Sequence, residues 1–211
     1  MISEVLIVAR RGREPHIDCS GGLAARRTEP DTVHLVSAAA TPLGGDTVTV
    51  RVVVEPGARL KVRTAAATMV LPSAVTSESH SSWELEVHGD LDVDPQPTIV
   101  AGGSRHVVTT RLVAGVGSRV RIRERAQIGR TFERHGFWSA ALHADVDDTP
   151  LLRHRVELGT GAVADDTLGN PLACVSELRY PTESFGVFDA PGELLELAAG
   201  GCLATWQGDR L

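Results

Sequence analysis

The histidines and cysteines, which could bind a metal ion or serve as a base or nucleophile, are spread along the whole chain. None of the eight histidines lies in an HxH or HExxH pattern, and the three cysteines form no CxxC pair. Tight transition-metal sites usually draw their ligands from closer spacings. His154 lies in phase with Leu152, Val156 and Leu158, so we predict that it faces the core. We interpret the cysteines as small buried hydrophobic residues; they are Cys19, Cys174 and Cys202.

The segment "IGRTFERHGFW", residues 128–138, holds the densest group of polar and aromatic side chains. Glu133 and His135 lie two positions apart in it, and together they could hold a divalent ion weakly. Aromatic residues beside arginine and glycine are also typical of a protein contact surface. A loop whose aromatic rings pack into the core is an equally open interpretation.

Motifs of the common catalytic and nucleotide-binding sites are absent from the sequence. The stretch "GGDTVTV" opens a strand rather than a helix and lacks the lysine of a phosphate-binding loop. No GxSxG pattern occurs, and no local pattern supports a Cys–His nucleophile pair. The chain is therefore predicted to be a binding or scaffold protein with no reaction of its own.

The composition narrows the class of partner. The net charge is -6 and aromatic residues make up 4%, which disfavours nucleic-acid binding. No apolar run approaches the ~20 residues that span a membrane. The N-terminal apolar run is interrupted by Glu4 and followed by arginines, the reverse of a signal peptide. We expect a soluble, cytoplasmic protein that binds neither nucleic acid nor membrane.

Any site must be positioned by short segments rich in Val, Thr and Leu, which alternate with turn signals along the chain. This pattern is typical of stacked antiparallel sheets. We predict a single, mainly all-β domain over residues 1–211, built from hairpins in series, with a weak internal repeat between 44–64 and 102–124. The four hairpins join 47–54 to 58–64, 83–87 to 91–93, 105–113 to 118–124 and 142–146 to 151–158.

Two segments depart from this pattern. In "APGELLELAAGGC", Pro191 and Glu193 are placed as in a first helical turn, and two glycines follow the leucines. One or two short helices are therefore expected near the C-terminus. Residues 65–82 are small and polar after Pro72 and are expected to form a loop.

The outward faces of the predicted strands alternate in charge. Basic side chains line two of them and acidic side chains a third, at every second residue. Opposite charges across neighbouring strands are stabilising, so the acidic strands are predicted to lie beside basic ones. A docking site for phosphate is the alternative. The basic residues are Arg59, Lys61, Arg63, Arg119, Arg121, Arg123 and Arg125, and the acidic ones Glu84, Glu86, Asp90, Asp92 and Asp94.

Four stretches, taken in order, resemble the urease accessory proteins of the UreD (UreH) family. They are "TPLGGDTVTVRVVVEPGARLKVRTAAAT", "DPQPTIVAGGSRHVVTTRLVAGVGSRVRIRERAQIGR", "GFWSAALHADVDDTPLLRHRVELG" and "LAAGGCLATW". Together they cover most of residues 33–206. The resemblance implies stacked sheets with two helices, and a non-enzymatic chaperone that assists nickel insertion into urease.

The resemblance also implies partners: the urease apoprotein, a UreF-like accessory protein and a UreG-like GTPase. Nickel would be in transit through an internal passage, and no cofactor would be bound tightly. A homodimer is a further expectation. Two other readings of the residues stay open, a generic β-sandwich binding module and a cupin-like metal-dependent enzyme.

Candidate passage residues carried over from matching positions are Asp46, Gln96, Glu124 and Arg130, and composition adds Glu133 and His135. A nickel passage needs weak oxygen or nitrogen ligands, so that the ion can enter and leave. Glu124 is out of phase with the basic residues around it, which favours a carboxylate inside the stack. For Asp46 the alternative is a turn residue that caps its own backbone.

Overall fold

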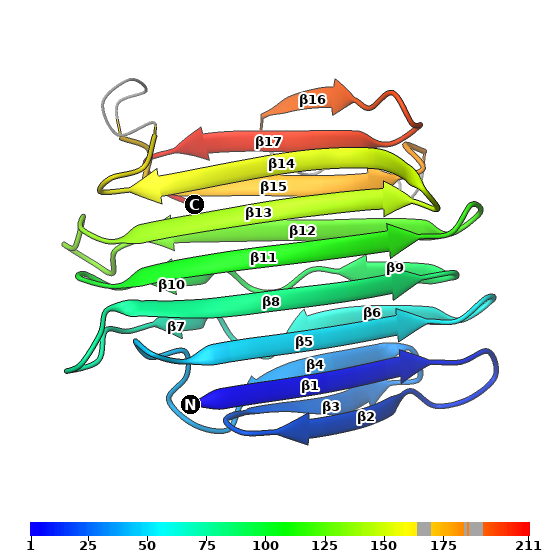
Figure 1. Ribbon diagram of the computed structural model, residues 1–211, viewed down its shortest axis with the longest axis horizontal. Helices are drawn as coiled ribbons and strands as arrows, with labels where there is room; N and C mark the ends of the chain where they lie inside the picture. Colours follow the sequence, from blue (N-terminus) through cyan, green and yellow to red (C-terminus); the bar gives the residue numbers. More distant parts are fainter. Residues whose placement is uncertain (164–169, 184, 186–191) are drawn as a thin grey trace.

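The computed structural model describes residues 1–163, 170–183, 185 and 192–211, which form two β-sheets stacked face to face (Figure 1). Seventeen strands make up the two sheets, and the described residues contain no helix. The predicted all-β class with stacked sheets is confirmed. None of the described residues belongs to a helix long and apolar enough to cross a membrane.

The first sheet, sheet A, has seven strands in the order β14-β13-β11-β8-β5-β1-β2. Its five inner strands are mutually parallel, and an antiparallel strand closes each edge. The bounds are β1 Ile2–Ala9, β2 His16–Ser20, β5 Thr47–Val54, β8 Glu78–Val87, β11 Arg105–Ala114, β13 Phe137–Val146 and β14 Thr149–Gly159.

The second sheet, sheet B, has ten strands, eight of them in the order β16-β17-β15-β12-β9-β6-β4-β3. Two short strands, β7 and β10, lie off this path, and β10 pairs with both β7 and β12. The bounds are β3 Leu23–Glu29, β4 Thr32–Ser37, β6 Arg59–Thr64, β7 Thr68–Val70, β9 Asp90–Val93, β10 Thr98–Val100, β12 Arg119–Ile128, β15 Ala173–Tyr180, β16 Glu193–Glu196 and β17 Cys202–Gly208.

Three of the four predicted hairpins are wrong. The chain leaves β5, β8 or β11 in sheet A and crosses to β6, β9 or β12 in sheet B, so each turn is an arch between sheets (Figure 1). Alternating apolar residues fix which face of a strand is buried, but they do not say which strand accepts its hydrogen bonds. Only β13 and β14 form the predicted antiparallel hairpin. Successive coils therefore stack in parallel, as in a β-solenoid.

The apolar core lies between the sheets and is made mainly of Val, Leu and Ala. Val52, Leu85 and Leu112 lie in register across three neighbouring strands of sheet A and are almost inaccessible. Because equivalent positions of each coil stack on one another, their side chains form ladders along the stack. The core divides into two clusters, and Trp83 packs against both. His154 is half-buried on β14, in phase with Val156 and Leu158 as predicted.

The predicted C-terminal helix is wrong in its described part, because residues 193–196 form strand β16, antiparallel to β17. Leucine and glutamate are good helix formers, but intrinsic helix propensity is small in energy, and pairing with β17 in sheet B overrides it. Pro191 lies outside the described residues. The loop expected over residues 65–82 is interrupted by β7, and β8 already begins at Glu78.

The predicted pairing of acidic with basic strands is confirmed on the outer face of sheet B. Strand β9 lies between β6 and β12, so Asp90 is in register with Arg59 and Arg119. Its carboxylate lies 3.4 Å from the Arg59 guanidinium and 3.7 Å from that of Arg119. The basic faces are thus balanced by acidic residues of the same sheet.

Candidate functional site

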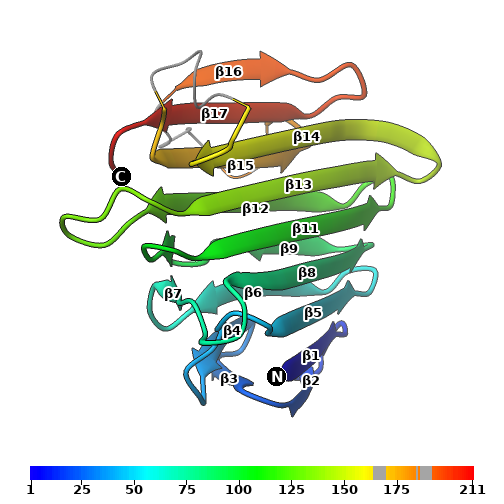
Figure 2. The same cartoon turned by 60° about the vertical axis from the view of Figure 1, so that its left-hand side comes forward.

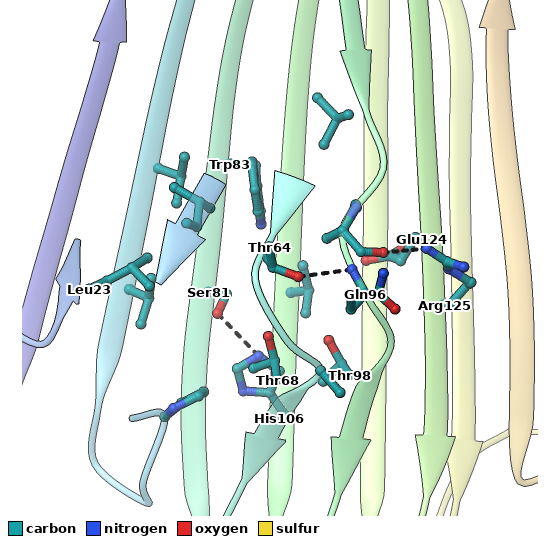
Figure 3. A pocket seen from close by; sticks show the side chains of 18 of the residues that line it. Leu23, Thr64, Thr68, Ser81, Trp83, Gln96, Thr98, His106, Glu124 and Arg125 are labelled. Atoms are coloured by element: carbon teal, nitrogen blue, oxygen red, sulfur yellow. Dashed lines mark hydrogen bonds between the residues drawn. The ribbon is translucent and has the colours of Figure 1, made fainter. Parts of the chain in front are cut away.

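Sheet B is interrupted in the middle. Residues 65–67 separate β6 from β7, and residues 94–97 separate β9 from β10. The two interruptions are neighbours, because the backbone N–H of Gln96 donates a hydrogen bond of 2.9 Å to Oγ1 of Thr64 (Figure 3). Without strand pairing at this level, the sheet leaves a window toward the core.

A cavity of about 490 Å³ lies behind this window, between the two sheets. Its exposed lining residues lie on the interrupted segments of sheet B, on β7, and at the end of β4 with the connection that follows it. Much of its deep lining comes from the inward faces of β8, β11 and β12. Figure 3 shows Gln96 and Thr64 at the window, with Trp83 and His106 deeper in. The volume is in the range of small-ligand sites.

Glu124 places a carboxylate in this cavity. On β12 Glu124 is in phase with the inward-facing Ile122 and Ala126, as predicted, whereas Arg121, Arg123 and Arg125 are on the opposite phase. Arg123 and Arg125 also line the cavity, and Figure 3 shows Arg125 next to Glu124. Burial raises the pKa of Glu124 to about 7. No hydrogen bond or ion pair reaches its carboxylate from the described residues, and the hydroxyl of Ser176, its register partner on β15, is also unpartnered there. The cavity thus contains a carboxyl group that can gain a proton or a cation near neutral pH.

A buried histidine lines another part of the cavity. Nδ1 of His106 lies 2.9 Å from Oγ of Ser79, and Nε2 lies 3.1 Å from Oγ of Ser81. Burial, and to a lesser extent the charge of His80, lowers the pKa of His106 from 6.5 to about 4. The imidazole is therefore neutral at pH 7, with each ring nitrogen engaged by a serine hydroxyl.

His106 should make the fold sensitive to acid. Its pKa is lower in the folded chain than in the unfolded chain, so the unfolded state binds the extra proton between pH 6.5 and 4. The contribution of His106 to stability should therefore fall by up to about 3 kcal/mol as the pH drops through this window, and it opposes the contribution of Glu124, whose pKa is raised. Urea unfolding of the wild type and of His106→Gln, at a series of pH values, measures it.

Gln is the chosen replacement because it can both donate to one serine and accept from the other. The stability of the wild type relative to His106→Gln should fall as the pH drops through this window, while its stability relative to His143→Gln, on the exposed face of β13, should stay constant. An unchanged pH slope in His106→Gln would show that another group controls acid unfolding.

Of the six predicted passage residues, the cavity brings together two, Gln96 at the window and Glu124 inside. Asp46 instead is a buried turn residue, as the alternative proposed. It accepts hydrogen bonds from Leu43 N–H (2.9 Å), Thr41 Oγ1 (2.9 Å) and the α-amino group of Met1 (2.6 Å). Burial opposes ionisation, but these bonds hold the pKa of Asp46 below its ordinary value.

The other three predicted residues, Arg130, Glu133 and His135, do not line the cavity. They lie on the connection between β12 and β13, where the Arg130 guanidinium forms an ion pair with the Glu133 carboxylate. Sequence reasoning missed His106. The predicted strand over 105–113 places it in phase with Val108 and Leu112, so alternation alone could have identified it as inward-facing.

No group of three or more His, Cys, Asp or Glu side chains that could hold a metal ion occurs among the residues that the structure describes. A cupin-like enzyme needs such a cluster, so this reading gains no support here. The polar lining of the cavity is a few separated oxygen and nitrogen groups, together with the guanidinium groups of Arg123 and Arg125, in a largely apolar wall. That arrangement suits weak, transient contact with a small cargo better than tight binding.

The fold and cavity define a class of protein: two sheets of stacked, mainly parallel coils around an internal, windowed space. The model of the UreD urease accessory protein family matches residues 17–182, and the chain belongs to this family. "Urease accessory protein UreD 1" of Saccharopolyspora erythraea is 37% identical over 195 residues, which cover 87% of this chain and 74% of the relative.

Two further relatives show the same identity over shorter shares of their length. The UreD protein of Frankia alni is 37% identical over 84% of this chain and 59% of its own length. That of Streptomyces avermitilis is 37% identical over 70% of this chain and 61% of its own. The chain therefore spans about three fifths to three quarters of these relatives.

Proposed function

We propose that this protein is a non-enzymatic scaffold in urease maturation that passes nickel through its internal cavity. It would bind a UreF-like protein, which brings a UreG-like GTPase, and dock on the urease apoprotein. Membership of the UreD family supports the maturation role. The observation that carries the passage is the unpaired Glu124 carboxylate inside a cavity that opens through sheet B.

The chemistry of the cavity fits a cargo that must leave again. Separate carboxylate, amide and hydroxyl oxygens bind a divalent ion weakly. The cavity presents such oxygens singly, on Gln96 at the window and on Thr98 and Glu124. Because Glu124 has a pKa of about 7, an arriving cation has only to displace a proton that is already loosely held. Weak sites in series permit conduction where one tight site would retain the ion.

The test is the nickel content of urease matured with and without this protein. A urease-positive host with the gene deleted should yield urease with little nickel, and restoring the gene should restore the metal. Nickel per active site, measured by plasma mass spectrometry on purified urease, is the readout. A tagged copy should co-purify with the urease apoprotein. Full metallation without the gene would refute the proposal.

A further inference from the structure

The connection between β12 and β13 presents an aromatic ring to solvent. Phe132 is 100% exposed, although phenylalanine is usually buried in soluble proteins. Its φ of 70° is in the left-handed region, which is unfavourable for a bulky side chain. Figure 2 shows this connection projecting beyond the ends of the strands. Such a conformation persists only where surrounding contacts impose it.

Those contacts come from Glu133. Its carboxylate accepts hydrogen bonds from the backbone N–H of Gly102 (2.9 Å) and of Arg130 (3.0 Å), and from the Arg130 guanidinium. Gly129 enters the turn at a φ of 80°, where a Cβ would lie 2.0 Å from the carbonyl oxygen of Glu133. The turn is therefore fixed in shape, and this shape directs Phe132 outward.

Two further apolar side chains are exposed at the same end of the stack. Among the described residues, the three most exposed large hydrophobic side chains are Phe132, Val75 (94%) and Val163 (86%). Val75 lies just before β8 and Val163 just after β14, and the strand register places both ends beside the start of β11 and β13. Three exposed apolar side chains at one end of the molecule are typical of an interaction surface.

Charge on the turn specifies the partner further. Arg130 is neutralised by Glu133, but Arg134 is exposed and has no ion pair among the described residues. His135 is exposed beside it. A partner that receives the ring must therefore accept a cation at the edge of the contact.

We propose that residues 130–135 form a rigid anchor that inserts Phe132 into an apolar pocket, rimmed by carboxylates, on a protein partner. An aromatic ring in a pocket with arginine at the rim is the usual composition of an interface hot spot. The partner is a protein rather than a lipid surface, because three apolar side chains and one cation without an ion pair among the described residues are too little for stable membrane binding. The inference rests on the proposed function, which supplies the proteins to be tested.

The test compares the wild type with Phe132→Ala and, as a matched control, Val116→Ala. Val116 is also exposed (78%) but lies in the turn between β11 and β12, at the opposite end of the stack. Dissociation constants are measured by biolayer interferometry against the urease apoprotein, the UreF-like protein and the UreG-like protein of the same host. Phe132→Ala should weaken binding of one of them at least tenfold, with an unchanged Tm, and Val116→Ala should weaken none.

Arg134→Glu should weaken the same partner, and this loss should shrink at high salt. If the wild type binds but Phe132→Ala binds all three within twofold of it, the anchor is wrong and the proposed function stands. If the wild type binds none of the three, both fail. Phe132-dependent binding to anionic phospholipid vesicles, with protein binding intact, would overturn the anchor in favour of membrane contact.

Discussion

Glu177→Gln should lower the free energy of unfolding by about 3–5 kcal/mol, the cost of breaking a buried ion pair from one side. The Glu177 side chain is 0% exposed, and its carboxylate lies 2.5 Å from Nε of both Arg123 and Arg179. A third guanidinium, that of Arg121, lies 3.3 Å away. Burial opposes the charge, yet hydrogen bonds from Arg121 and Arg179 keep the pKa of Glu177 below its ordinary value.

The amide of glutamine keeps the shape of Glu177 but removes the charge, and Arg123 has no other described ion-pair partner. Asp90→Asn on the same sheet is the matched control. Asp90 also faces two arginines, but these are largely exposed, so its loss should cost less than about 1 kcal/mol. Urea unfolding of both variants at pH 7 separates the two cases. Equal losses of unfolding free energy in the two variants would mean that the burial of Glu177 does not increase the cost of removing its charge.

Glu124→Gln should stabilise the protein while it impairs nickel transfer. Because the pKa of Glu124 is raised to about 7 in the folded chain, ionisation penalises the folded state as the pH rises from 4.5 to 7. The variant removes this penalty, which amounts to as much as about 3 kcal/mol and less where cavity water screens the charge. The gain should appear at pH 8 and be absent at pH 4.

The same variant removes the one carboxylate that the described residues contribute to the cavity, so nickel per urease site should fall toward the level of the gene deletion. Glu84→Gln, on the exposed outer face of β8, should change neither stability nor nickel content. A residue that costs stability but is needed for transfer is the signature of a functional position. Normal nickel content with Glu124→Gln would rule out this carboxylate as a passage ligand.

The alternation of apolar and polar residues in the sequence correctly predicted which side chains point into the core and which point outward. Glu124 was placed inside the stack from its phase, and the acidic and basic strands were paired from their charges. The partners of each strand were not predictable in the same way. The alternation of apolar residues around Val52 is the same whether the chain turns back beside that strand or crosses to the opposite sheet. Tertiary packing, and not the local pattern, distinguishes a hairpin from an arch.

The candidate site was only partly predictable for a related reason. Trp83, Gln96, His106 and Glu124 lie on four different segments of two sheets, and only the stacking of coils brings the four to one cavity. Asp46, in contrast, follows a Gly-Gly turn, and its local hydrogen bonds take up its carboxylate. Hydrogen bonds between residues close in sequence could be predicted from the sequence. The meeting of side chains from two different sheets could not.

The stacked coils also determine where in the molecule unfolding begins. Each inner coil is hydrogen-bonded to its neighbours on both sides, whereas β2, β3, β14 and β16 each have a partner on one side only. In such a one-dimensional array, opening starts at the terminal units and advances inward. The window in sheet B lies between β6, β9 and β12, near the middle of that array, so fraying at either end leaves it intact.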